Sequence, residues 1–228
     1  MATIYWAADS TVQYNDIRTF PQTGIGQVFH LFLKPEVEVR NHAKNGRSTK
    51  SFIDESRLSV IYNRIGEGDF LFIQFGHNDE KEADPDRYTE PFGGYMANLE
   101  KFVQAARDKK AWPVLITPLE RRCFVDEHRL GAGEHGAYVE AMKQTAEKLD
   151  VPLIALYSMS RAEMEKAGAE KTKEWYMHLP EGVYPYHMEG LADNTHLKYQ
   201  GAVVYGGCIA RGLKELGGRY GDLLVAWD

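Results

Sequence analysis

A serine near the start of the chain, Ser10, has the chemistry of a nucleophile if other parts of the sequence activate it. A serine hydroxyl is weakly nucleophilic at neutral pH, so it needs a general base and an acid that orients the base. The segment 193–196 reads Asp-Asn-Thr-His and places an acid, Asp193, three positions before a base, His196. In a turn, both side chains can face one point, where Asp193 would orient His196 while His196 takes the proton of Ser10.

Two further residues could stabilise the negative charge that develops on a substrate oxygen during such an attack. Gly46 lies in a polar stretch, where a backbone without a side chain can turn its N–H toward a ligand. Asn78 carries a neutral amide donor. Together with the backbone N–H of Ser10, these donors could form an oxyanion hole. Acyl transfer through these groups needs no cofactor.

Each of these residues also has an ordinary structural interpretation. Ser10 could cap a helix, as serine often does. The segment 193–196 could form an Asx-turn before the next helix. Gly46 and Asn78 could each serve a turn. The catalytic interpretation therefore depends on whether the fold brings all of these residues to one place.

The alternation of apolar runs and helical patterns predicts how the chain positions these residues. Continuous runs of β-branched and aromatic residues are typical of strands buried on both faces. The expected strands are at residues 3–7, 37–41, 69–75, 113–118 and 152–157. The expected helices are at residues 52–65, 95–109, 138–149 and 200–216. This pattern predicts an α/β fold with a parallel sheet covered by helices on both faces. Functional residues of such sheets gather where the strands end.

Composition limits the classes of protein that this chain can be. The chain has 228 residues, of which 43% are hydrophobic, which fits one domain over residues 1–228. The net charge of −6 offers no positive field for nucleic acid, so an anionic substrate would need a few local arginines. No apolar stretch is long enough to span a membrane, and the N-terminal residues lack a signal-peptide pattern. We therefore expect a soluble, cytoplasmic protein with no membrane or nucleic-acid partner, of open oligomeric state.

Two motifs that suggest a bound cofactor or metal lack the context that they require. Residues 131–136 match the glycine pattern of dinucleotide-binding folds, but the preceding expected strand ends about a dozen residues earlier. The histidines at 77, 178, 187 and 196 lack the helical spacing of zinc hydrolases. Cys123 and Cys208 lie far apart and are expected to be free thiols. We expect neither cofactor nor metal.

Four ordered segments resemble those of the SGNH (GDSL-type) hydrolases, in particular the rhamnogalacturonan acetylesterase-like branch. They are residues 8–11 (Ala-Asp-Ser-Thr), 41–48 (Asn-His-Ala-Lys-Asn-Gly-Arg-Ser), 74–79 (Gln-Phe-Gly-His-Asn-Asp) and 193–196 (Asp-Asn-Thr-His). The resemblance covers nearly the whole chain. It implies a flavodoxin-like three-layer α/β/α sandwich around a five-stranded parallel sheet. The catalytic residues that it implies are Ser10, His196 and Asp193, with Ser10, Gly46 and Asn78 as oxyanion donors.

One residue departs from the family pattern beside the nucleophile. The chain has Ala8 where the family usually has glycine. If the backbone has a negative φ there, the added methyl group costs little. A positive φ would cost about 1 kcal/mol or more, so the backbone at Ala8 decides whether Ser10 is well placed.

The resemblance implies a carbohydrate O-acetylesterase that acts on pectin-derived oligosaccharides, with a small acetylated oligosaccharide as its partner. Arg47, Arg122 and His187 are the candidate substrate-binding residues. A guanidinium can bind a carboxylate through two hydrogen bonds, and the ring of His187 could contribute to an aromatic wall. Trp175 and Tyr184, with their neighbours, could form an aromatic wall or pack in an ordinary loop. The alternatives are a broad GDSL-type esterase, lipase or thioesterase, and a non-catalytic carbohydrate-binding relative.

Overall fold

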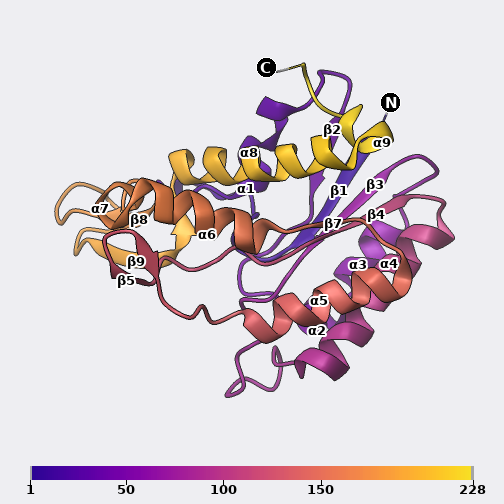
Figure 1. Ribbon diagram of the computed structural model, residues 1–228, viewed down its shortest axis with the longest axis horizontal. Coiled ribbons are helices and arrows are strands. Elements are labelled where there is room, and N and C mark those ends of the chain that lie inside the picture. Colours follow the sequence, from indigo (N-terminus) through magenta and orange to yellow (C-terminus); the bar gives the residue numbers. More distant parts are fainter. Residues whose placement is uncertain (1, 227–228) are drawn as a thin grey trace.

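The computed structural model describes residues 2–226, and a parallel five-stranded sheet lies at its centre (Figure 1). The sheet order is β2-β1-β3-β4-β7. The strands are β1 (Thr3–Ala8), β2 (Glu38–Asn41), β3 (Phe70–Gln74), β4 (Trp112–Ile116) and β7 (Leu153–Ile154). The chain adds β2 on one side of β1 and then continues on the other side with β3. The topological switch point therefore lies at the carboxyl ends of β1 and β3.

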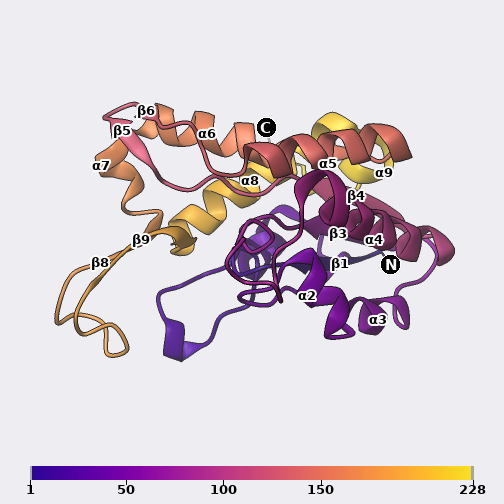
Figure 2. The same cartoon turned by 90° about the horizontal axis from the view of Figure 1, so that it is seen from below.

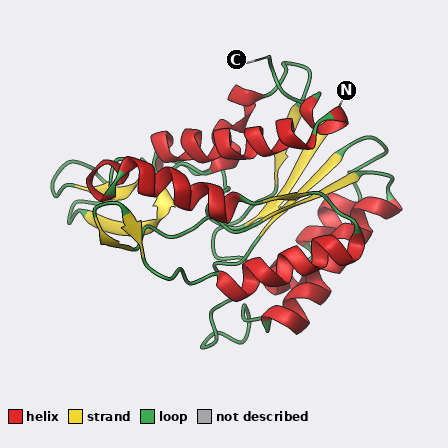
Figure 3. Ribbon diagram, in the orientation of Figure 1, coloured by secondary structure: helices red, strands yellow, loops and turns green. Residues whose placement is uncertain are grey.

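Helices cover both faces of the sheet, as the alternating pattern predicts (Figure 3). One layer contains α1 (Ile25–Val28), α6 (Leu156–Ala167) and α8 (Tyr199–Leu216). The other contains α2 (Thr49–Asp54), α3 (Arg57–Tyr62), α4 (Met96–Asp108) and α5 (Gly136–Leu149). Successive residues of β1 face opposite cores: Ile4 and Trp6 pack in the first, Tyr5 and Ala7 in the second. The three-layer sandwich is confirmed.

Several smaller elements complete the chain. The helical ones are the 3-10 turns η1 (Ile17–Thr19) and η2 (Phe29–Phe32), the π-helical η3 (Pro91–Tyr95), and the short helices α7 (Ala169–Thr172) and α9 (Gly218–Gly221). Two antiparallel pairs lie outside the central sheet: β5 (Phe124–Asp126) with β6 (Arg129–Leu130), and β8 (Tyr176–Leu179) with β9 (Leu191–Leu197). The β8–β9 hairpin projects beyond the edge where the central strands end (Figure 2). No helix within residues 2–226 is long and apolar enough to cross a membrane.

The structure corrects two of the predicted elements. The helix expected over residues 52–65 is divided into α2 and α3, because Ser56 between them has a left-handed backbone with φ of 59°. The strand expected over residues 152–157 ends at Ile154, and α6 begins at Leu156. Here the buried residues at 156, 160 and 164 follow a helical spacing that extends the apolar run of the strand.

Candidate active site

The residues selected from the sequence converge at the carboxyl edge of the sheet. Ser10, Gly46 and Asn78 follow the ends of β1, β2 and β3, while Asp193 and His196 belong to β9. All of them line one cavity of about 390 Å³. The cavity therefore joins the switch point of the sheet to the β8–β9 hairpin.

Ser10, His196 and Asp193 form a continuous chain of hydrogen-bond contacts. His196 Nε2 lies 3.0 Å from Ser10 Oγ, and His196 Nδ1 lies 2.6 Å from Asp193 Oδ2. The other carboxylate oxygen of Asp193 accepts the backbone N–H groups of Thr195 (2.7 Å) and His196 (3.0 Å). The Asx-turn considered from the sequence is thus present, inside a strand, and it fixes the carboxylate that orients the imidazole. This is the geometry of a base-activated serine.

The same contacts keep Asp193 ionised. Burial by itself raises the pKa of the Asp193 carboxyl, but the hydrogen bond and the charge of His196, with the N–H groups of His196 and Thr195, lower it to about 2. At neutral pH a carboxylate at this position can stabilise the imidazolium that forms when His196 accepts a proton.

The backbone conformation at Ala8 decides whether its methyl group causes strain beside Ser10. Ala8 lies in β1, fully buried in the core, and its φ is not positive. The alanine methyl therefore causes no backbone strain. Ser10 itself lies in a turn rather than at a helix start, and the next helical turn is capped by Asp16. The turn is held by Asp9, whose side chain accepts the N–H (2.9 Å) and the hydroxyl (2.8 Å) of Thr11.

Gly46 and Asn78, the predicted oxyanion donors, both line the Ser10 cavity. Gly46 has a φ of +77°, a conformation that favours glycine, and lines the cavity. Asn78 is 3% exposed, and its amide nitrogen donates to the carbonyl of Arg47 (3.1 Å). Since an amide nitrogen carries two hydrogens, a second one remains for a ligand.

A buried polar network lies beneath the cavity, and sequence reasoning missed most of it. The ring of His77 lies 4.3 Å from that of His135, and His135 Nδ1 lies 2.7 Å from Glu80 Oε2. Burial and the nearby His135 lower the pKa of His77 to about 4. Glu80 is largely buried, and it accepts a hydrogen bond from Arg121 (2.8 Å). Sequence reasoning missed this network because the partners of Glu80, His135 and Arg121, are far away in the chain.

The structure places Arg121, rather than Arg122, at the cavity. Arg122 is buried away from it and donates to Thr172 Oγ1 (2.9 Å), to Asn194 Oδ1 (3.1 Å) and to the carbonyl of Ala169. Adjacent residues of an extended segment point in opposite directions, so Arg121 faces the cavity and donates to Thr195 Oγ1 (2.6 Å). Arg122, predicted as a substrate contact, therefore does not line the Ser10 cavity and instead supports β9 from behind.

Arg47 and His187, the other predicted substrate contacts, do not line the Ser10 cavity either. The Arg47 guanidinium pairs with Glu55 (2.8 Å) and lines a separate surface hollow of about 290 Å³. His187 lies in the loop between β8 and β9, where its backbone N–H donates to the carbonyl of Tyr184 (2.8 Å). Both residues belong to loops outside the lining of the Ser10 cavity.

Two further expectations concern the aromatic residues and the glycine-rich motif. Trp175 packs edge-to-face on Tyr205, whereas Tyr184 lines a second cavity. The motif at 131–136 leads from the short β6 into α5, so no parallel strand precedes it as dinucleotide binding requires. Among residues 2–226, no group of three His, Cys, Asp or Glu residues is arranged to hold a metal ion.

The fold and the site together define a class of protein. A serine, a histidine and an aspartate in hydrogen-bond contact at the switch point of an α/β/α sandwich are the features of a serine hydrolase. The chain belongs to the GDSL-like lipase/acylhydrolase family, whose sequence model matches residues 9–202. The expected family is therefore confirmed.

Comparison with known proteins narrows this class. The chain is 40% identical to the rhamnogalacturonan acetylesterase RhgT of Bacillus subtilis, over 98% of this chain and 94% of that protein. It is 41% identical to the probable rhamnogalacturonan acetylesterase YesY of Bacillus subtilis, over 94% and 93%. The protein is therefore a serine esterase, as the sequence predicts.

Solved structures share the fold. The protein YxiM of Bacillus subtilis superposes with a TM-score of 0.79 at 24% identity, over 95% of this chain and 57% of that one. An acetylxylan esterase of Geobacillus stearothermophilus, Axe2, superposes with a TM-score of 0.63 at 16% identity, over 92% and 93%. At these identities the likeness concerns the fold alone, and it agrees with the five-stranded sandwich.

Proposed function

We propose that this esterase is a carbohydrate O-acetylesterase that removes acetyl groups from pectin-derived rhamnogalacturonan oligosaccharides. The observation that carries the proposal is the contact chain from Ser10 through His196 to Asp193. It occurs in a protein that is 40% identical, over 98% of its residues, to a rhamnogalacturonan acetylesterase. The contacts among these three residues support acyl transfer, and the identity to a rhamnogalacturonan acetylesterase supports an acetylated carbohydrate as the substrate.

The proposed reaction has two steps. Ser10 Oγ attacks the acetyl carbonyl and passes its proton to His196, and the carbonyl oxygen becomes an oxyanion facing the N–H groups of Ser10 and Gly46 and the amide of Asn78. The C–O bond to the sugar then breaks, and His196 protonates the departing sugar hydroxyl. In the second step His196 takes a proton from water, the resulting hydroxide attacks the acetyl-enzyme, and acetate leaves as Ser10 regains its proton.

The lining of the Ser10 cavity supports a short acyl group on a polar substrate. None of its lining residues has an aliphatic side chain: they are Ser10, Gln22, Asn45, Gly46, His77, Asn78, Lys81, Arg121, Asp193, Thr195 and His196. A lipase or a long-chain thioesterase would need an apolar channel for its acyl chain. We therefore expect acetyl esters to be hydrolysed in preference to octanoyl esters, and equal rates for both would favour the broad-esterase alternative.

Two cations at this cavity support a substrate that carries carboxylates, as galacturonate residues do. Lys81 and Arg121 both line the cavity. Arg121 already pairs with Glu80, whereas Lys81 makes no ion pair with any residue in 2–226. In a protein of net charge −6, such local cations are what can attract a uronate.

Acetate release from acetylated rhamnogalacturonan oligosaccharides tests the proposal. Ser10→Ala removes the nucleophile and should lower kcat by roughly a million-fold, to the background rate. Unchanged acetate release by this variant would exclude Ser10 as the nucleophile. A serine-reactive phosphonate separates catalysis from mere carbohydrate binding, because a non-catalytic relative would fail to be labelled at Ser10 while still folded.

A further inference from the structure

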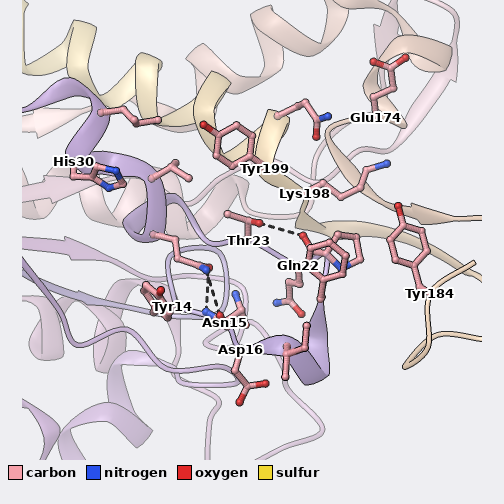
Figure 4. A pocket seen from close by; sticks show the side chains of 17 residues that line it. Tyr14, Asn15, Asp16, Gln22, Thr23, His30, Glu174, Tyr184, Lys198 and Tyr199 are labelled. Atoms are coloured by element: carbon pink, nitrogen blue, oxygen red, sulfur yellow. Dashed lines mark hydrogen bonds between the residues drawn. The ribbon is translucent and has the colours of Figure 1, made fainter.

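A second and larger cavity, of about 800 Å³, lies beside the Ser10 cavity (Figure 4). Its walls come from two parts of the chain that are distant in sequence, residues 14–31 and residues 174–200. Figure 4 shows Lys198 and Tyr199 on one side, Tyr14 and Asp16 on the other, and Gln22 between them. Nothing in the proposed reaction uses this space.

Gln22 connects the two cavities. It is the residue that lines both the Ser10 cavity and the larger one, within the residues that the structure describes. The next residue, Thr23, donates its backbone N–H to the carbonyl of Leu197 (2.8 Å), the residue after His196. The wall between the cavities is therefore fastened to the strand that carries His196, and a ligand that extends from one cavity to the other would lie against Gln22.

The side chain of Gln22 has an unused donor at this junction. Its amide nitrogen Nε2 is buried and has no hydrogen-bond partner within residues 2–226. Buried polar groups are nearly always paired, so an unpaired one calls for an explanation. A ligand oxygen that lies across the junction would supply the missing acceptor.

The lining of the larger cavity has the mixed character that sugars require. The residues Tyr14, Phe20 and Tyr199 are 70%, 54% and 54% exposed, and the centroid of the Phe20 ring lies 6.1 Å from that of the Tyr184 ring. Amide groups line the same space, at Asn15 among others. A pyranose ring has an apolar C–H face and a rim of hydroxyl groups, which match an aromatic surface and nearby amides.

We infer that this cavity binds the sugar residues that neighbour the acetylated one, with Gln22 donating to a sugar oxygen where the chain leaves the Ser10 cavity. The enzyme then selects oligosaccharides by length, because only a chain longer than the acetylated residue fills both cavities. This inference rests on the proposed function and adds to it a binding site for the flanking sugars.

The test compares kcat/KM for acetate release across substrate lengths. The substrates are an acetylated monosaccharide, acetylated rhamnogalacturonan oligosaccharides of increasing length, and para-nitrophenyl acetate, which carries an acetyl ester without any sugar. For the wild type we expect kcat/KM to rise by at least about 10-fold from the monosaccharide to the longer chains. Tyr184→Ala and Gln22→Leu should remove most of that rise, and their loss on long chains should exceed their loss on para-nitrophenyl acetate.

Tyr186→Ala is the matched control, because Tyr186 is in the same loop, is 56% exposed and lines neither cavity. It should keep the full dependence on length. Tyr14→Ala, on the opposite wall and 70% exposed, provides a second variant if Tyr184→Ala is unstable. Equal kcat/KM for all lengths, or equal losses in Tyr184→Ala and Tyr186→Ala, would overturn the inference alone. Hydrolysis of para-nitrophenyl acetate without acetate release from any saccharide would overturn the proposed function, and this inference with it.

Discussion

At the scale of single residues, the carboxylate of Asp193 has two separable tasks. Its Oδ1 holds the local turn through the N–H groups of Thr195 and His196, and its Oδ2 orients the imidazole. An asparagine can still accept both backbone N–H groups through its carbonyl oxygen, but it carries no charge. A substitution at this position can therefore separate structure from chemistry.

We expect Asp193→Asn to fold normally and to lose about 10³- to 10⁴-fold in kcat, because the imidazolium is no longer stabilised and the imidazole can take the wrong tautomer. Acetate release under saturating substrate measures this. Asp126→Asn, which alters an exposed ion pair with Arg129, is the control and should keep wild-type activity. A kcat within a few-fold of wild type in Asp193→Asn would contradict the role of Asp193.

The lowered pKa of Asp193 also predicts a dependence of stability on pH. Its pKa in the folded protein is about 2, below the ordinary value of 3.8, so the folded state favours the charged carboxylate. The resulting stabilisation, roughly 2 kcal/mol, is present above the ordinary pKa and is lost as the pH falls toward 2. Near pH 7, the free energy of unfolding in urea should therefore be higher for the wild type than for Asp193→Asn. A difference that stays constant down to about pH 3 would show that the charge of Asp193 contributes little.

At the scale of elements, the approach of β3 to the chain after β4 leaves no room for a side chain at Gly76. A Cβ there would lie 2.8 Å from Cγ of Pro118 and 2.9 Å from its Cβ. A proline ring cannot turn aside, so the two segments would have to separate. Asn78 follows Gly76 by two residues and would move with it.

Gly76→Ala should therefore destabilise the fold by about 1–3 kcal/mol and lower kcat as well. Gly66→Ala is the matched control, since a Cβ at Gly66 meets nothing closer than 3.8 Å. Urea denaturation and acetate release on both variants would check this. Equal stability of the two variants would mean that the contact with Pro118 relaxes without cost.

The sequence predicted the sheet because its strands are buried on both faces and read as apolar runs, as residues 70–74 do. The site followed in part, since Ser10 and Asn78 come shortly after such runs, whereas Gly46 follows the half-exposed edge strand β2. The β8–β9 hairpin was missed, because its strand β9 is largely polar and is held by contacts from elsewhere in the chain, such as that between Arg122 and Asn194. The sequence pattern of a short segment does not reveal contacts with residues more than seventy positions away.

At the scale of the whole molecule, the net charge of the protein and the cation at its cavity have opposite effects on the approach of an anionic substrate. The net charge of −6 repels a uronate chain at long range, and Lys81 attracts it at the cavity. On the proposed function, binding of such a chain would depend on the cations of the cavity, Lys81 in particular, more than on the surface as a whole.

We expect Lys81→Gln to lower kcat/KM on galacturonate-containing substrates by about 3- to 10-fold, mainly through KM, and to leave neutral acetylated sugars unaffected. The effect should diminish as ionic strength rises. Lys109→Gln, beside Tyr62 and distant from the cavity, is the control. The same loss on charged and neutral sugars would show that Lys81 does not recognise the carboxylate.

The nucleophile and its base are separated by 186 positions along the chain. During synthesis, the turn that carries Ser10 leaves the ribosome long before the hairpin that carries His196 exists. Hydrolysis can therefore begin only after residue 196 has emerged and β9 has docked against the sheet edge. On the proposed mechanism, a chain that ends before residue 196 has no base for Ser10, so the appearance of esterase activity would mark the moment at which the two distant parts of this molecule first meet.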